Sequence, residues 1–258
     1  MNWNPWAGTP ENYRLSIADL VANGTMDAEV AGTLWAAADE QLSFLTVAVP
    51  RGAGKTTVAS AILGLRRPDV PLHPVLAEPD ELQDLRRQRL GGYVVVGELS
   101  PWAMPSYIWG QAVRDVFETL PHGYSLQTSL HAPGVEPAIR VVTAENRVSD
   151  EAASHLKLVV YIEVMRTRDG QTVRRVSEVF EVDRVRNGAP EGRTLFRWHA
   201  GDDRFERESE PAQFGLDQTR LQRRRDAIED LVRTGRTSTK DVADLVREFA
   251  SQGFGTPG

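Results

Sequence analysis

The chain has 258 residues, of which 41% are hydrophobic and 26% charged, and its formal net charge is −6. This is the balance of an ordinary globular protein with a sizeable core, and the negative charge gives the molecule no electrostatic match for nucleic acid. It has no cysteine, which excludes disulfides and cysteine-ligated metal centres. The start of the chain is not a signal peptide and no apolar run reaches membrane-spanning length, so we expect no transmembrane segment and a cytoplasmic protein.

The N-terminal segment, residues 1–41, is predicted to form an arm followed by a helical lead-in. Pro5 and Pro10 break any helix in the first twelve residues. Amphipathic patterns then predict one helix over residues 15–22 and a second over residues 27–41.

A buried strand, a glycine-containing turn and a helix follow one another. The apolar run 42–49 predicts the strand, and residues 56–65 predict the helix. In this context glycines let backbone N–H groups wrap a phosphate, a lysine reaches the outer phosphates and a hydroxyl holds Mg²⁺. The predicted nucleotide-binding residues are Arg51, Gly52, Ala53, Gly54, Lys55, Thr56 and Thr57, with Thr56 as a metal ligand. Val49 departs from this motif, which has glycine there; the alternative is a turn that contains Gly-Lys-Thr by chance.

Strands and helices alternate after the turn. Strands are predicted over residues 73–77, 93–96 and 125–130, and helices over residues 82–90, 107–120 and, for the most part, 136–156. This alternation predicts an α/β fold with a parallel sheet.

The pattern changes to that of an antiparallel meander. Strands are predicted over residues 157–166, 172–182 and 194–199, with a hairpin turn at Asp169-Gly170. A charged connection (201–214), helices over residues 216–233 and 239–249 and a disordered tail (253–258) complete the chain. The predicted division is therefore a lead-in (1–41), a core with an antiparallel extension (42–200) and a C-terminal helical segment (201–258).

Two carboxylates follow predicted strands at the edge where the turn lies. Nucleotide hydrolysis requires one carboxylate that holds Mg²⁺ through water and another that orients the attacking water. Glu98 follows the strand at 93–96, and Glu78 follows the strand at 73–77 with Asp80 and Glu81 close behind. The alternatives are a solvated loop acid at Glu98 and a solvated acidic turn at residues 78–81. His131 follows the strand at 125–130 and could contact the outer phosphate, although a single histidine is often structural.

Four blocks, in this order, resemble the secretion and pilus motor ATPases, the superfamily of type II and type IV secretion ATPases, most closely the Flp/Tad pilus branch. The blocks are the phosphate loop (47–57), an acidic box (78–82), a second acidic strand (94–99) and a histidine box (123–132). The lead-in and the meander agree with the family as well. The resemblance covers about residues 15–200 and implies a P-loop NTPase with a RecA-like core.

By this resemblance, Glu78 is the general base, Glu98 holds the water shell of Mg²⁺ and His131 couples the nucleotide state to neighbouring elements. The one-residue ambiguity of the acidic box leaves Asp80 as a competitor of Glu78. Ser100-Pro101 stands where the family has Arg-Asp. Before residue 15 we expect no counterpart of the family's N-terminal domain, which supplies arginines across subunits, so the chain resembles a reduced form.

The sequence thus predicts an ATP- and Mg²⁺-binding subunit, and by resemblance a bacterial secretion or type IV pilus ATPase. The resemblance implies an oligomer, such as a ring of six, or a hetero-oligomer with a full-length motor, and an inner-membrane platform protein as partner. A catalytically weak regulatory subunit is the alternative, and a P-loop kinase with Arg86, Arg87 and Arg89 in a lid is a third hypothesis. Arg51, Arg140 and Arg147 are the candidates for a cation that stabilises transferred phosphate.

A basic cluster near the C-terminus is predicted to be an ion-paired, exposed helix face rather than a nucleic-acid site. It consists of Arg220, Arg223, Arg224 and Arg225. Acidic residues at helical spacing neutralise it, so no direct contact with nucleic acid is expected.

Overall fold

The computed structural model describes residues 14–166 and 170–252. The predicted arm over residues 1–12, the predicted tail over residues 253–258 and Asp169 of the predicted hairpin turn lie outside this part of the chain. Within it, no helix combines the length and the apolar character that crossing a bilayer requires.

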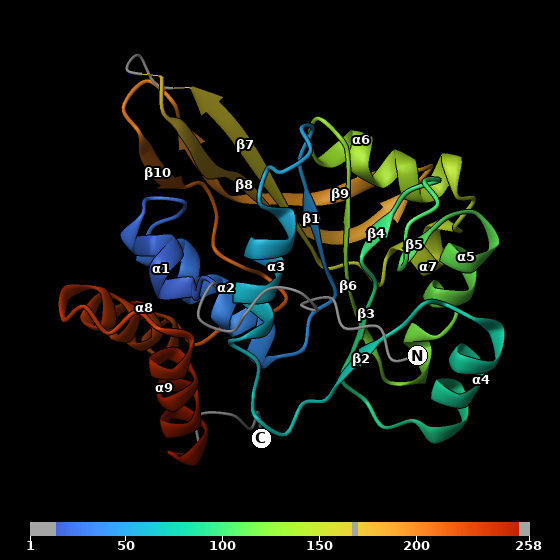
Figure 1. The fold of residues 1–258 in the computed structure, drawn as a ribbon, viewed down its shortest axis with the longest axis horizontal. Helices are drawn as coiled ribbons and strands as arrows, with labels where there is room; N and C mark the ends of the chain where they lie inside the picture. The colour runs from blue at the N-terminus through green and yellow to red at the C-terminus, as the bar shows by residue number, and fades with distance from the viewer. Residues whose placement is uncertain (1–13, 167–169, 253–258) are drawn as a thin grey trace.

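An eight-stranded sheet forms the centre of the fold (Figure 1). Five strands are parallel (β7, β1, β6, β3 and β2), and β8, β9 and β10 extend the sheet beyond β7 in antiparallel pairing. In sheet order the strands are β10 (Arg204–Arg207), β9 (Ala189–His199), β8 (Thr172–Arg186), β7 (Leu158–Arg166), β1 (Phe44–Val47), β6 (Ser125–Leu130), β3 (Tyr93–Val95) and β2 (Leu72–Pro74). The predicted mixed α/β class with a mostly parallel core is confirmed.

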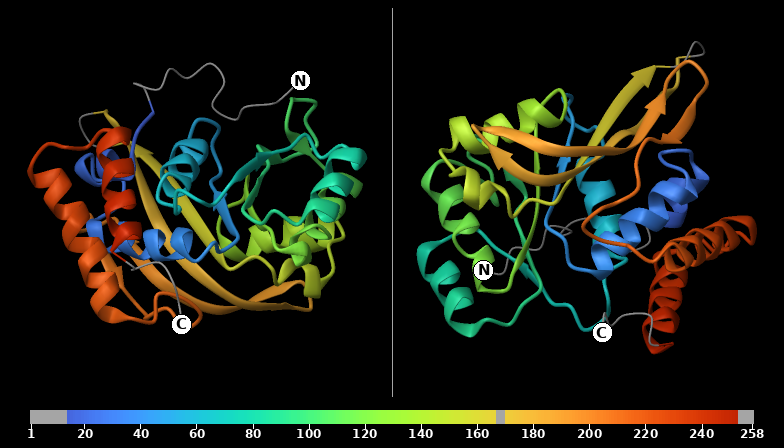
Figure 2. Two further views of the ribbon diagram at one scale, coloured as in Figure 1. Left: turned by 90° about the horizontal axis from the view of Figure 1, so that it is seen from below. Right: turned by 180° about the vertical axis from the view of Figure 1, so that it is seen from behind.

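Helices cover both faces of the sheet (Figure 2). One face carries α1 (Ile17–Ala22), α2 (Ala28–Asp39), α3 (Lys55–Leu63), α8 (Gln218–Arg233) and α9 (Thr239–Ser251). The other carries α4 (Pro79–Gln88), α5 (Gln111–Phe117), α6 (Val135–Arg140) and α7 (Asp150–Ala153). Alternate residues of one strand enter opposite cores: Phe44 packs on the first face and Leu45 on the second.

Polar caps fix the ends of the helices around the lead-in. Ser16 forms a capping box with Asp19 at the start of α1, and its hydroxyl also donates to the Thr237 carbonyl ahead of α9. Asp27 caps α2 by accepting from the Val30 N–H at 2.8 Å. The lead-in is therefore anchored to the C-terminal helices, although it is distant from them in sequence.

The structure corrects the predicted helix at residues 107–120. Tyr107–Ile108 form β5, which pairs with β4 (Glu98–Leu99) in a separate two-stranded sheet, and α5 begins only at Gln111. Gly110 precedes it with a φ of 65°, a conformation in which a side chain is strained. The pairing with β4 replaces the first turn of the predicted helix.

The predicted helix over residues 136–156 is also interrupted. A π-helical turn at Val141–Glu145 follows α6 and ends at the buried Asn146, whose side chain accepts from the Gly110 N–H at 2.7 Å. Further along, the third meander strand begins at Ala189 rather than residue 194, and the predicted charged connection contains β10.

Candidate functional site

The turn after β1 is the predicted phosphate loop, and it contains two glycines whose backbone conformation other residues rarely adopt. Gly52 and Gly54 have φ values of 72° and 96°, in the left-handed region that favours glycine. Gly54 starts α3 without a side-chain cap, which leaves the first N–H groups of this helix available to an anion. Val49 lies outside the left-handed region, so the valine in place of the motif's first glycine does not strain the loop.

The structure brings together three of the predicted site residues, Lys55, Glu98 and His131. Lys55 lies in the first turn of α3, Glu98 begins β4 just beyond β3, and His131 follows β6. Because β1, β6 and β3 are parallel neighbours, their carboxyl ends meet at one edge of the sheet. The Lys55 Nζ lies 3.2 Å from Glu98 Oε2 and 3.0 Å from His131 Nε2. Glu98 is therefore not the solvated loop acid of the alternative interpretation, since it is only 6% exposed.

His131 contacts both the backbone before the loop and the lysine within it. Its Nδ1 lies 2.8 Å from the Val49 carbonyl oxygen, which can only accept, so this contact favours a proton on Nδ1. The Lys55 Nζ lies 3.0 Å from Nε2 and 3.3 Å from Nδ1, and Nε2 lies 3.5 Å from Glu98 Oε1. His131 thus connects Val49, which precedes the loop 51–57, to Lys55 of that loop.

Burial sets the electrostatics of this group. Burial lowers the pKa of Lys55, and the ion pair with Glu98 opposes that shift in part. Burial, followed by the nearby Glu98 carboxylate, raises the pKa of Tyr107. A phosphate oxyanion would compete with Glu98 and His131 for the Lys55 ammonium.

Oxygen donors suited to Mg²⁺ line a hollow of about 180 Å³ beside α3. The Thr56 hydroxyl and the Glu98 carboxylate share it with Ser60 and Ser129. Mg²⁺ is usually held by one or two protein oxygens together with substrate phosphates, so the predicted ligands Thr56 and Glu98 fit it. In the described ranges no three His, Cys, Asp or Glu side chains gather as a metal cluster.

The structure does not bring Glu78 into this group. Glu78 is exposed and precedes α4 without capping it, and Asp80 is exposed too. β2 lies three strand spacings from β1 in the sheet, about 14 Å. The carboxylate with a structural contact is that of Glu81, which accepts from the N–H groups of Leu76 and Ala77 at 2.9 and 3.1 Å.

The predicted cations lie in different places. The Arg51 guanidinium lies over the ring of Trp102, 4.1 Å from its centroid, and Trp102 is 61% exposed. Arg140 ends α6, Arg147 follows the π-helical turn, and both are exposed. Of the three, Arg51 alone belongs to the phosphate loop.

A cation that the sequence analysis missed lies on the loop. Arg174 of β8 donates from Nη2 and Nε to the Gly52 carbonyl at 3.0 and 3.3 Å. It lines a hollow of about 420 Å³ together with loop residues and the lead-in. The sequence pattern predicts only that Arg174 is an exposed residue of a strand. It does not predict a contact with a residue 122 positions away in the chain.

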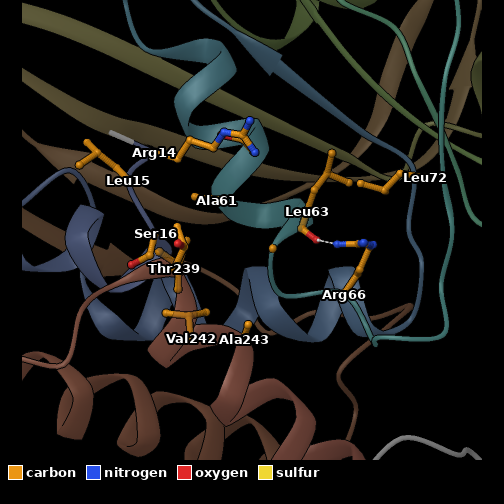
Figure 3. A pocket seen from close by; sticks show the side chains of 13 residues that line it. Arg14, Leu15, Ser16, Ala61, Leu63, Arg66, Leu72, Thr239, Val242 and Ala243 are labelled. Carbon is orange, nitrogen blue, oxygen red and sulfur yellow. Dashed lines mark hydrogen bonds between the residues drawn. The ribbon is translucent and has the colours of Figure 1, made fainter. Parts of the chain in front are cut away.

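Two further hollows lie away from the loop. One of about 370 Å³ lies between α3, the start of α1 and α9, and none of the predicted site residues lines it (Figure 3). The other, of about 460 Å³, is bordered by Arg220 and Arg224. The basic cluster is only partly the exposed face we predicted, because Arg224 is buried and pairs with Asp39 of α2 at 2.6 Å.

No protein-family model matches the chain, and no curated protein sequence does. Among solved structures it is similar to the VirB11 ATPase from the Brucella suis type IV secretion system in complex with sulphate, at 18% identity and a TM-score of 0.42 over 70% of this chain and 57% of that one. It is also similar to the ATPase DotB of Yersinia pseudotuberculosis, at 12% identity and a TM-score of 0.44 over 88% of this chain and 62% of that one. For the ATPase DotB of Legionella pneumophila the identity is 16% and the TM-score 0.38, over 52% of this chain and 44% of that one. The chain thus spans 44 to 62% of the length of these proteins.

Proposed function

We propose that the chain binds MgATP at the loop 51–57 and hydrolyses it. The observation that carries this proposal is the contact of the buried Lys55 with the buried Glu98 and the partly exposed His131, in the first turn of a helix whose N-terminus has no side-chain cap. The ammonium of a buried lysine that contacts a carboxylate and an imidazole can exchange these partners for a phosphate oxyanion without leaving the site.

In the proposed mechanism, the backbone N–H groups of the loop and the Lys55 ammonium bind the phosphates. Mg²⁺, held by Thr56 and the water shell on Glu98, would supply charge neutralisation at the outer phosphates. His131 loses its lysine contact when Lys55 turns to phosphate, while its Nδ1–H stays on the Val49 carbonyl. This makes His131 the group that registers whether the loop is filled.

Glu78 acts as the general base in this proposal, with Asp80 as its competitor. Because Glu78 is exposed and follows β2, which lies three strands from β1, this proposal requires that it approach the nucleotide by a movement of the segment before α4 or across a subunit boundary. This observation favours a second candidate function, a regulatory subunit that binds ATP and turns it over slowly or not at all.

We further propose that the chain works in a secretion or pilus-assembly machine of the Flp/Tad kind, as part of a ring or beside a full-length motor. A cytoplasmic position next to an inner-membrane platform protein belongs to the same proposal. The four motifs, in their order along the chain, support it.

The test is nucleotide binding and phosphate release by the purified protein with Mg²⁺ and ATP over a range of protein concentrations. Lys55→Ala should abolish both. Lys240→Ala is the matched control, because Lys240 is an exposed lysine paired with Asp244 on α9, and it should leave both unchanged. Release that rises per subunit with protein concentration would support shared sites. Binding without release would support the regulatory subunit, and absence of binding would refute both functions.

A further inference from the structure

Arg174 has an unusual position among the arginines of β8. Its Cδ lies 3.2 Å from the point where a Cβ on Gly54 would stand, so its stem crosses the loop at the start of α3. Its guanidinium ends on the Gly52 carbonyl with two donors. Its neighbour Arg175 is neutralised by Asp203 at 2.7 Å, whereas the ion pairs formed within residues 14–166 and 170–252 include none for Arg174. Among the described residues, the guanidinium of Arg174 therefore has a carbonyl oxygen of the loop as its partner and no carboxylate.

The loop has two sides, and Arg174 lies on the one away from Glu98. Thr56 and Ser60 line the hollow that contains Glu98, whereas Thr57 and Val58 line the larger hollow that contains Arg174. Successive residues of a helix point about 100° apart, so these two hollows flank α3 on different sides. The side of Lys55, Glu98 and Thr56 suits the outer phosphates and Mg²⁺.

The larger hollow suits the rest of a nucleotide. Its volume of about 420 Å³ lies in the range of small-molecule sites, and the lead-in borders it through Asn23 and Thr25. If the outer phosphates of a nucleotide meet Lys55, an inner phosphate and nucleoside placed in this hollow would lie next to Arg174.

From this geometry we propose that Arg174 is a nucleotide-binding residue that moves from the Gly52 carbonyl to the phosphates nearest the nucleoside. The inference rests on the proposed function and deepens it by assigning a cation from the same chain to the phosphates that ATP and ADP share. A phosphate oxyanion is a stronger acceptor for a planar guanidinium than a neutral carbonyl, and it accepts both donors with matched geometry. Arg174 therefore raises the affinity for both nucleotides alike.

The experiment measures the affinities of wild type and Arg174→Ala for MgATP and for ADP, and KM and kcat wherever turnover is observed. The expected result is a loss of about tenfold in affinity for both nucleotides, with KM raised and kcat within about twofold of wild type. Arg184→Ala is the matched control, because Arg184 is an exposed arginine of the same strand that pairs with Glu191, and it should leave both affinities unchanged.

A second variant separates phosphate binding from bracing of the loop. Arg174→Gln keeps a donor for the Gly52 carbonyl but lacks the charge, so a phosphate contact predicts that glutamine is as defective as alanine. Restored affinity in this variant would overturn the proposal in favour of a brace. A loss confined to ATP, or a fall in kcat at unchanged KM, would overturn it in favour of a contact with the outer phosphate. If wild type binds neither nucleotide, the proposed function fails and the inference with it. If wild type binds and Arg174→Ala binds equally well, the inference alone fails.

Discussion

Replacing Glu98 by glutamine tests whether the buried ion pair behind the loop is as costly to break as its geometry implies. The Nζ–Oε2 distance is 3.2 Å and both side chains are 8% exposed, so Glu98→Gln leaves the Lys55 ammonium buried without a counter-charge. Removal of one partner of a buried pair costs about 3–5 kcal/mol in the free energy of unfolding. Lys55 can escape by folding as a neutral amine, which at pH 7 costs about 5 kcal/mol and sets the upper limit. The glutamine amide still accepts from the ammonium, so we expect about 3 kcal/mol.

The assay is urea unfolding of the nucleotide-free protein at pH 7. Glu191→Gln is the control, since it removes a half-exposed partner of Arg184 and should cost no more than about 1 kcal/mol. In a Lys55→Met background, Glu98→Gln should lose most of its cost, because the charge that it strands is gone. A Glu98→Gln variant within about 0.5 kcal/mol of the control, or equal costs in both backgrounds, would refute the assignment of this ion pair as a buried and coupled one.

Three further predictions concern stability. Burial lowers the folded-state pKa of Lys55, so the unfolded chain binds more protons between that lowered value and 10.5. The free energy of unfolding of wild type should therefore rise with pH across this window. Parallel urea titrations should show a steeper rise for wild type than for Lys55→Met. Glu81→Ala should cost about 1–3 kcal/mol by leaving two backbone N–H groups unbound, whereas Glu78→Ala should change unfolding by less than about 0.5 kcal/mol; equal costs would contradict the contacts of Glu81. Arg224→Ala should cost about 3 kcal/mol by stranding Asp39, as measured by urea unfolding, and an effect below 1 kcal/mol would contradict the burial of this pair.

The sequence predicts the parallel half of the fold well because each of its strands carries its own signal. The apolar run before the loop and the strand over residues 125–130 are local patterns, and β6 has the predicted bounds. Glu98 and His131 were predicted as site residues because they follow strands, and parallel strands gather the residues at their carboxyl ends whatever their separation in the chain. The meeting of these two residues with Lys55 follows from topology alone.

The features that the sequence does not predict depend on partners far away in the chain. Tyr107 lies in a strand because it pairs with the backbone of Glu98–Leu99. The hydrophobic periodicity around Tyr107 does not predict this pairing. The helix after α6 is interrupted where Asn146 binds the backbone of Gly110. β10 has charged residues on an exposed edge and lacks the apolar alternation by which strands are recognised. Arg174 belongs with these cases, since its partner is a carbonyl, and a carbonyl has no sequence signature.

The position of β1 explains how one short loop can receive groups from both halves of the sheet. β1 pairs with β6 on one side and with β7 on the other, so it is the strand next to the boundary where parallel pairing gives way to antiparallel pairing. On the parallel side, the residues near the loop are those that follow the strands, and they include Glu98 and His131. On the antiparallel side, β8 runs in the opposite direction to β7, so Arg174 within that strand contacts the loop. The antiparallel extension is thus more than a continuation of the sheet, because residues 171–175 line the hollow on the Arg174 side of the loop together with the lead-in.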